Sequence, residues 1–170
     1  PLLVVPDLRR RAGEIAGRFY QDPSADLSVI GITGTNGKTS CSLFLAQALS
    51  ETRPCAVIGT LGSGLPPNLV PASHTTPDPV SLQARLAELR AAGAEAISME
   101  VSSHALDQRR VASLEFAAGV YTNLTREHLD YHRDLESYRQ AKLKLADQVR
   151  PDGTCVVNAD DPAWDSADFS

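Results

Sequence analysis

Residues 31–39, of sequence GITGTNGKT, carry the groups best suited to chemistry in this chain. An apolar stretch over residues 27–32 runs into this segment, and Lys38 and Thr39 open an expected helix over residues 38–50. In a strand–turn–helix unit of this kind, backbone N–H groups and the helix N-terminus face phosphate oxygens. The segment therefore predicts a nucleotide site in which Lys38 contacts the β- and γ-phosphates and the Thr39 hydroxyl binds Mg²⁺.

This loop departs from the strict pattern G-x4-G-K-[ST], because Ile32 stands where the pattern has its first glycine. The glycines fall instead at Gly31, Gly34 and Gly37. A glycine-rich turn that binds no ligand is the alternative interpretation. The apolar strand before the loop and the helix after it favour nucleotide binding.

Two further polar residues follow expected strands. Glu100 lies at the end of the apolar stretch 96–101, and His128 comes shortly after the stretch 116–121. Ligands of open α/β sheets bind at the carboxyl ends of the strands, so a carboxylate there is placed to hold magnesium beside the nucleotide phosphates. We expect Glu100 to do so and His128 to contact the metal or a phosphate. A solvated acid and a structural histidine are the alternatives.

Lys142 interrupts an apolar stripe on the helix expected over residues 134–149. Spacings of 3, 4, 3 and 4 place one set of residues on a single face, namely Leu135, Tyr138, Lys142, Leu145 and Val149. Lys144 lies roughly 160° around the helix, toward solvent. Of these two lysines, only Lys142 is therefore expected to point inward.

A buried ammonium is costly unless it is paired or loses its proton. A neutral lysine amine can react with carbon dioxide to form a carbamate, whereas an arginine stays protonated. A lysine whose stem covers apolar surface while its amine reaches water is the alternative. The periodicity around Lys142 by itself favours that alternative.

The order of the elements predicts an α/β fold: a phosphate-loop domain whose mostly parallel sheet has helices on both faces. Strands are expected at 27–32, 55–58, 96–101, 116–121 and 154–157, and helices at 8–20, 38–50, 80–92 and 134–149. A loop rich in glycine and proline fills residues 59–79, and residues 21–24 form a linker turn.

The composition disfavours several classes of function. The net charge is −5 and no basic block extends beyond Arg9–Arg11, so a nucleic-acid surface is not expected. No apolar run approaches the roughly 20 residues that span a bilayer. The first residues lack the features of a signal peptide, and the 3 cysteines show neither metal nor disulfide spacing. A reducing cytoplasm fits best.

Together, these residues resemble the Mur ligase family, and within it the UDP-N-acetylmuramoyl-tripeptide synthetases. The resemblance runs from about residue 27 to residue 162 and rests on an ordered series of motifs. These are TGTNGKT at 33–39, HTTP at 74–77, MEVSSH at 99–104, QRRV at 108–111, TNL at 122–124, EHLDYH at 127–132, QAK at 140–142 and NADD at 158–161.

The resemblance implies a reaction and its partners. ATP would phosphorylate the terminal carboxylate of UDP-N-acetylmuramoyl-L-alanyl-D-glutamate, and the amine of meso-diaminopimelate or L-lysine would displace phosphate from the acyl phosphate. The implied cofactors are ATP and Mg²⁺, and the expected protein is a cytoplasmic monomer. Family members have three domains. Residues 1–26 are expected to be the tail of the UDP-binding domain, and residues 27–170 a truncated central ATP-binding domain that is inactive by itself.

The resemblance also assigns roles by position. The expected catalytic residues are Lys38, Lys142 and His128. Nucleotide contacts are expected from Gly34, Thr35, Asn36, Gly37, Lys38, Thr39, Asn123 and Asn158. The metal ligands would be Thr39, Glu100, His128 and Lys142, the last as a carbamate, which reverses the interpretation from periodicity. The substrate would be held by Thr75, Thr76, Ser102, Gln108 and Arg110.

Three competing interpretations remain at this stage. Folylpolyglutamate synthetase shares the phosphate loop, but the segments 99–104 and 127–132 argue against it. A phosphate-loop kinase or GTPase would need an acceptor or guanine site, and no N-K-x-D-like segment is present. The third is a fragment that binds nucleotide without turnover.

Overall fold

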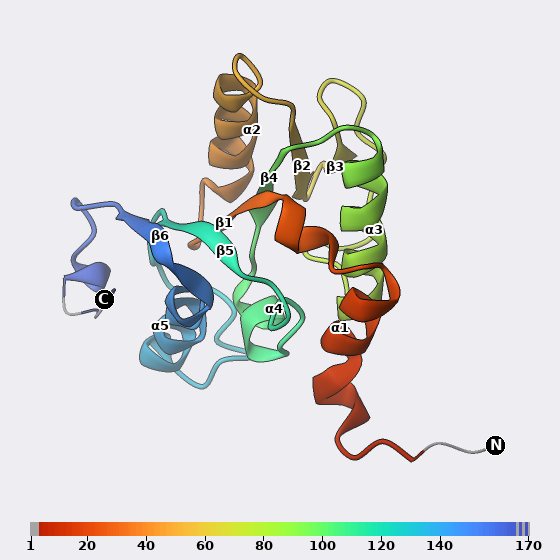
Figure 1. Ribbon diagram of the computed structural model, residues 1–170. Helices are drawn as coiled ribbons and strands as arrows, with labels where there is room; N and C mark the ends of the chain where they lie inside the picture. The colour runs from red at the N-terminus through yellow and green to blue at the C-terminus, as the bar shows by residue number, and fades with distance from the viewer. Residues whose placement is uncertain (1–3, 166, 168, 170) are drawn as a thin grey trace.

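The computed structural model describes residues 4–165, 167 and 169, and these form one layered α/β unit (Figure 1). The strands are β1 (Ser28–Thr33), β2 (Cys55–Gly59), β3 (Gly62–Gly64), β4 (Ala96–Glu100), β5 (Phe116–Tyr121) and β6 (Val149–Val157). The helices are α1 (Leu8–Phe19), α2 (Lys38–Leu49), α3 (Pro79–Ala91), α4 (Ser103–Asp107) and α5 (Leu135–Leu143). Residues 1–3, 166, 168 and 170, at the outer ends of the two expected domain segments, lie outside the described residues.

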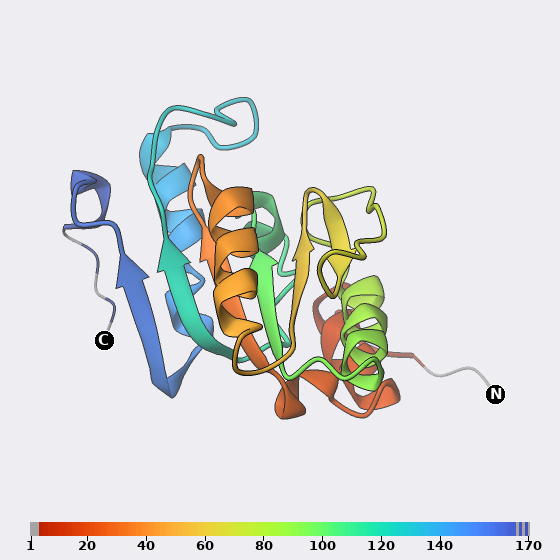
Figure 2. The ribbon, with the colours of Figure 1, turned by 90° about the horizontal axis from the view of Figure 1, so that it is seen from above.

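The strands pair in the order β3-β2-β4-β1-β5-β6, and the described sheet is parallel except for the β2–β3 pair. The first strand of the phosphate-loop unit, β1, lies between β4 and β5 (Figure 2). Its register places Ile32 beside Glu100 and Thr33 beside Tyr121. Because these strands are parallel, the residues that follow them gather at one edge of the sheet.

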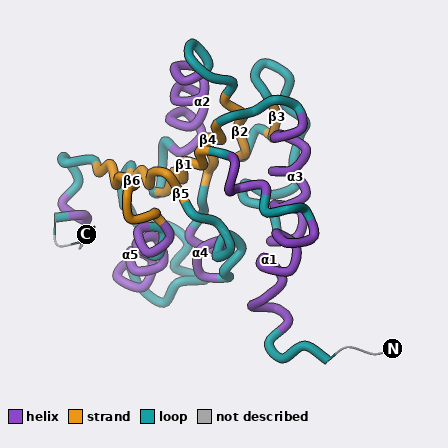
Figure 3. The backbone as a smooth tube through the Cα atoms, viewed as in Figure 1, coloured by secondary structure: helices purple, strands orange, loops and turns teal. Residues whose placement is uncertain are grey.

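Helices cover both faces of this sheet, as the prediction required. Helix α2 lies alone on one face, and α3, α4 and α5 lie on the other (Figures 1 and 3). Successive residues of β4 alternate between these layers: Ile97 and Met99 join the large core, whereas Ala96 joins the smaller cluster under α2. None of the described helices has the length and apolar character that crossing a bilayer requires.

The helices differ in how their N-termini are capped. The Asp78 carboxylate accepts hydrogen bonds from the first N–H groups of α3, and Asp134 accepts one from Ser137 at the start of α5. Helix α2 differs, because it follows Gly37 at φ 84° and no side chain caps it. The first N–H groups of any helix lack intrahelical partners, and in α2 no capping side chain takes their place.

The helices and strands that the sequence predicts match the structure to within one residue at each end, except after residue 143. The helix expected to reach residue 149 ends at Leu143, and the strand expected from residue 154 begins at Val149. This difference arises from a tertiary contact. Strand β5 has one edge that β1 does not pair with, and Val149 pairs there with Phe116, next to a shift in the register of the two strands. Pro151 lies within this outer strand, where a missing N–H is tolerated. The short elements β3 and α4 were missed.

Helix α1 is docked on the body through small residues. Gly13, Ala16 and Gly17 are buried, and a Cβ built on Gly13 would lie 2.6 Å from the Ser113 hydroxyl oxygen. The guanidinium of Arg90 on α3 donates to the carbonyls of the turn after α1 and pairs with Asp26 at 2.8 Å. The helix is therefore held at both ends of its contact with α3.

A substitution of Gly31 tests how tightly strand β1 is packed. A Cβ built there would lie 2.9 Å from carbons of Phe116 and Leu145. We expect Gly31→Val to lower the free energy of unfolding by about 1–3 kcal/mol through overpacking, as measured by urea denaturation. Thr154→Val on the exposed side of β6 is the control and should change stability by less than about 0.5 kcal/mol. Equal stability of both variants would contradict the packing described.

Candidate active site

A cavity of 290 Å³ opens where the carboxyl ends of β1, β2 and β4 meet. Segments from distant parts of the chain line it, and most of their groups are polar. Those lining residues are Thr35, Asn36, Gly37, Lys38, Thr39, Thr60, Thr75, Glu100, Ser102, Ser103, His128, Tyr138 and Lys142. The structure thus brings together ten of the residues predicted for the site.

The phosphate loop is braced by Asn123. The backbone N–H of Thr35 donates to the Asn123 carbonyl at 2.7 Å, and the N–H of Asn36 donates to the Asn123 side chain at 2.9 Å. These two N–H groups are therefore engaged within the protein. The uncapped N-terminus of α2 remains, and such a terminus favours a bound anion.

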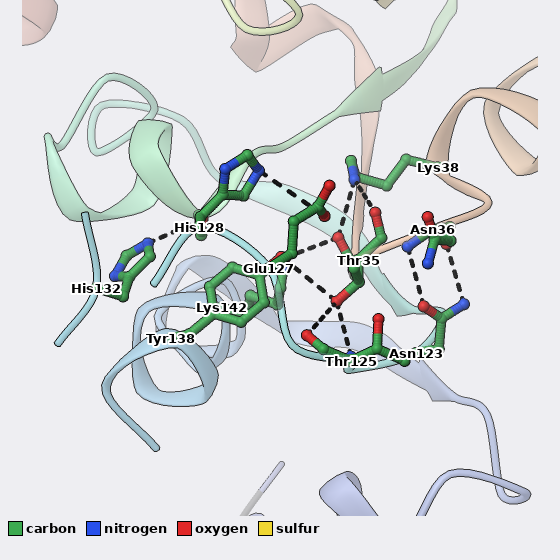
Figure 4. Close-up of polar contacts among 12 residues, drawn as sticks. Thr35, Asn36, Lys38, Asn123, Thr125, Glu127, His128, His132, Tyr138 and Lys142 are labelled. Carbon is green, nitrogen blue, oxygen red and sulfur yellow. Dashed lines mark hydrogen bonds and ion pairs between the residues drawn. The ribbon is translucent and has the colours of Figure 1, made fainter. Parts of the chain in front are cut away.

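Two lysines donate to the same carbonyl oxygen of this loop. The Lys38 ammonium lies 2.9 Å from the Gly34 oxygen, and the Lys142 ammonium lies 2.7 Å from it (Figure 4). Lys38 also donates to the Thr35 carbonyl at 2.7 Å. Burial lowers the pKa of Lys38, and the nearby Glu100 carboxylate partly offsets this. The cavity therefore holds two lysine amines close together, with one carboxylate nearby.

Lys142 is buried, with 1% of its surface exposed. Its nitrogen lies 4.3 Å from the centre of the Tyr138 ring, whose hydroxyl is 3.4 Å from the Thr35 hydroxyl. Burial, with a smaller effect from the charge of Lys38, lowers the pKa of Lys142 to about 7. The alternative of a snorkelling lysine is therefore wrong, whereas Lys144 pairs with Asp107 at the surface, as predicted.

Glu100 is buried at the end of β4 and accepts hydrogen bonds from two neighbouring segments. The Thr39 hydroxyl donates at 2.9 Å, and Thr60 donates through its N–H at 2.8 Å and its hydroxyl at 3.2 Å. Thr60 was not predicted, although it follows β2 directly. The strand-end rule that selected Glu100 would have selected Thr60 as well.

The oxygens of Glu100 and Thr39 fit a magnesium ion. Magnesium prefers hard oxygen ligands and is commonly held by one or two carboxylates together with nucleotide phosphates. Among the described residues no group of three or more His, Cys, Asp and Glu side chains converges on a point. These residues therefore suit a metal shared with phosphate more than a cage made by protein alone.

His128 lies at the rim of the cavity in a left-handed backbone conformation, with φ 53°. Its ring centre is 4.9 Å from that of His104, which in turn is 5.6 Å from His132. His132 is buried and hydrogen-bonds to the Ser103 hydroxyl at 3.0 Å. Burial lowers the pKa of His104 and of His132, so the interior of this cluster favours neutral imidazoles.

The residues predicted to hold substrate separate into two groups. Thr75 and Ser102 line the cavity described above, whereas Gln108 and Arg110 line an adjoining one. Thr76 is buried, and its hydroxyl donates to the Glu100 carbonyl and accepts from the Ser102 N–H. Its hydroxyl therefore helps to position the end of β4 and the segment that follows it.

Asn123 and Asn158, both predicted to contact the nucleotide, form hydrogen bonds to backbone groups of the protein. The Asn123 side chain hydrogen-bonds to both backbone groups of Asn36. Asn158 caps a turn after β6 by accepting from the Asp160 N–H at 3.1 Å, and it is not among the described residues that line the cavity. Both side chains thus shape backbone here.

The sheet order, the loop between β1 and α2 and the lysine-rich cavity define a nucleotide-binding protein of the phosphate-loop α/β class. Residues 32–168 also match the family model of the Mur ligase middle domain. The chain therefore belongs to the Mur ligase family, as a middle domain.

Individual relatives agree with this assignment. The chain is 56% identical over 162 residues to the UDP-N-acetylmuramoyl-L-alanyl-D-glutamate–2,6-diaminopimelate ligase of Coxiella burnetii, covering 95% of this chain and 33% of the relative. For the Pseudomonas aeruginosa ligase of the same name the identity is 52% over 163 residues, with 95% and 33% covered. A solved structure of such a ligase has a TM-score of 0.84 at 41% identity, covering 96% of this chain and 33% of its own.

Folylpolyglutamate synthase of Mycobacterium tuberculosis has a TM-score of 0.70 at 18% identity, with 93% of this chain and 43% of the other covered, a likeness that shows the fold alone. The chain spans about a third of the length of the curated relatives that it matches.

Lys142 gives a prediction for stability against pH. Its pKa falls from an ordinary 10.5 to about 7 on folding, so between these values the unfolded chain binds more protons and stability rises with pH. Lys142→Met should remove this rise, lowering the slope between pH 7 and 9 by up to about 1.4 kcal/mol per pH unit. Urea denaturation in bicarbonate-free buffer measures it, and Lys144→Met is the control. A slope unchanged in Lys142→Met would contradict a buried, proton-releasing lysine.

Proposed function

We propose that the full-length protein containing this chain is an ATP-dependent ligase that adds an amino acid to UDP-N-acetylmuramoyl-L-alanyl-D-glutamate in cell-wall precursor synthesis. The observation that carries the proposal is the pair of lysines on the Gly34 carbonyl beside Glu100 and Thr39. Transfer of a phosphoryl group to a carboxylate brings two anions together. This grouping suits that reaction, because the lysines and a metal held by Glu100 and Thr39 would offset the repulsion between them. The names of the relatives supply the identity of the acceptor.

The amino acid is proposed to be meso-diaminopimelate and not L-lysine. Relatives from several bacteria that share 45–57% identity with this chain are named as 2,6-diaminopimelate ligases. The chain spans about a third of their length, so this choice rests on overall similarity and not on an amino-acid pocket.

The nucleotide phosphates are proposed to lie at the N-terminus of α2. There, the backbone of Gly37 and the side chains of Lys38 and Thr39 present donors, and Lys38 would exchange its loop carbonyls for β- and γ-phosphate oxygens. Thr39 and Glu100 would hold Mg²⁺, which offsets phosphate charge when bound. The γ-phosphoryl group then passes to the substrate carboxylate, and the amine of the incoming amino acid displaces phosphate from the acyl phosphate.

Lys142 is proposed to act as a carbamate. Its pKa of about 7 leaves much of the amine neutral at neutral pH, so its nitrogen can attack carbon dioxide and release a proton. The product is a carboxylate on a long stem beside Glu100 and His128, and these three residues could hold a second Mg²⁺. Tyr138, whose ring lies next to the Lys142 nitrogen, would orient it.

The residues that line the two cavities support the remaining assignments. Thr75, Ser102, Gln108 and Arg110 are proposed to bind the muramoyl-dipeptide, and Thr76 to position Glu100 and Arg110. Residues 1–26 are proposed to end a UDP-binding domain, and residues 27–170 to be part of the central domain of a cytoplasmic enzyme. The incoming amino acid would then depend on a further domain.

Phosphate release from Mg-ATP by the full-length protein tests the proposed reaction. We expect release only when UDP-N-acetylmuramoyl-L-alanyl-D-glutamate and meso-diaminopimelate are both present, with L-lysine supporting far less. Removal of Mg²⁺ by a chelator should abolish it. Release that requires L-lysine would reverse the choice of amino acid. Nucleotide binding without release under any of these conditions would contradict the ligase proposal.

Replacement of Lys142 tests the carbamate. We expect Lys142→Ala in the full-length protein to lower kcat by at least about 100-fold, because the site loses a charged ligand. A short-chain carboxylate added to the assay should restore part of that activity, whereas a matched alkylammonium salt should not. Lys144→Ala is the control and should keep full activity. Intact activity in Lys142→Ala, or rescue by the amine alone, would show that the carbamate assignment is wrong.

A further inference from the structure

A second cavity, of 380 Å³, lies between α1 and the segment that enters α3. Arg9 and Ala12 of α1 form one wall, and Gln108 and Arg110 form another. This cavity adjoins the first, because His74 lines the second and the next residue lines the first. A ligand that enters the first cavity can therefore extend toward α1.

Arg9 differs from the two arginines that follow it. Arg10 lies 4.0 Å from the carboxylate of Asp7, the residue before α1, and Arg11 lies 3.7 Å from that of Glu14. The Arg9 guanidinium forms no hydrogen bond or ion pair with any of the described residues. It is thus a cation without a neutralising partner that lines a cavity.

The docking of α1 fixes the direction of Arg9. Arg9, Gly13 and Ala16 are spaced by four and three residues, so they lie on one face of the helix. Gly13 and Ala16 are buried against the body of the protein. The side chain of Arg9, one turn earlier on this face, is therefore turned toward the cavity.

Arg110 lines the same cavity, and hydrogen bonds fix its orientation. Its guanidinium donates to the Gln108 side chain at 2.6 and 3.0 Å and to the Thr76 carbonyl at 3.0 Å. The acid in this lining, Asp78, caps α3, and hydrogen bonds from Ser81 and Val80 lower its pKa. Two guanidinium groups thus face a site whose single carboxylate is already engaged.

We propose that Arg9 is a substrate-binding residue that pairs with an oxyanion of the precursor other than the reacting carboxylate. This inference rests on the proposed function and deepens it, since it places a residue of the segment before the ATP-binding domain in the substrate site. The oxyanion is the second carboxylate of the D-glutamyl residue or the diphosphate. Both offer the paired oxygens that a planar guanidinium binds.

The test compares Arg9→Gln with Arg11→Gln in the full-length protein. Both variants remove one positive charge from the same helix, but Arg11 does not line the cavity. We expect Arg9→Gln to raise the KM for the precursor about tenfold, as for loss of one charged hydrogen bond, with kcat within about twofold. Arg11→Gln should keep wild-type constants, and neither variant should change the KM for ATP.

Two precursor analogues identify the oxyanion. One carries D-isoglutamine, which has an amide in place of the second carboxylate, and the other is the sugar 1-phosphate, which has one phosphate in place of two. The analogue that lacks the group bound by Arg9 should give the same KM with the wild type and with Arg9→Gln. A difference that persists with both analogues would overturn the inference, since Arg9 would then act through the docking of α1.

Equal KM values for Arg9→Gln and Arg11→Gln with the natural precursor would also overturn it. The wild-type protein in the same assay separates this result from failure of the proposed function. If the wild type turns over the precursor, only the role of Arg9 is lost. If it does not, the ligase proposal and the inference fail together.

Discussion

The convergence of two lysine side chains on one carbonyl oxygen, that of Gly34, is the constraint on which the site depends. Two ammonium groups held this close repel each other, and burial adds to the cost. Burial lowers the pKa of both lysines, and the charge of Lys38 adds to the lowering at Lys142, whereas Glu127, together with Glu100 at Lys38, offsets part of it. The result is a pocket that favours added negative charge, either from a phosphate or from conversion of Lys142 to a carbamate.

The sheet supplies the geometry that makes this convergence possible. Parallel pairing of β1 with β4 puts Glu100 directly beside the start of the phosphate loop. Hydrogen bonds from Thr39 and Thr60 then hold its carboxylate between α2 and the end of β2. Each of these residues follows a strand or opens a helix, so small shifts in register would separate groups that act together.

Helix α1 lies close to this centre. It is held against α3 by small residues and by Arg90, and it forms a wall of the second cavity. If this cavity binds substrate, as proposed, then a helix that from sequence resembled the tail of another domain lies beside the substrate.

The sequence by itself determined the class of fold and much of the site. The strand–turn–helix unit, the acid at Glu100 and the inward face of Lys142 all depend on local patterns, which short-range geometry reproduces. Only the tertiary structure decided where α5 ends, because the open edge of β5 draws Val149 into a strand. It alone showed that Asn123 braces the loop, that Thr60 binds Glu100 and that Arg9 faces a cavity. Each of these is a contact between residues distant in the chain, and local periodicity carries no information about such partners.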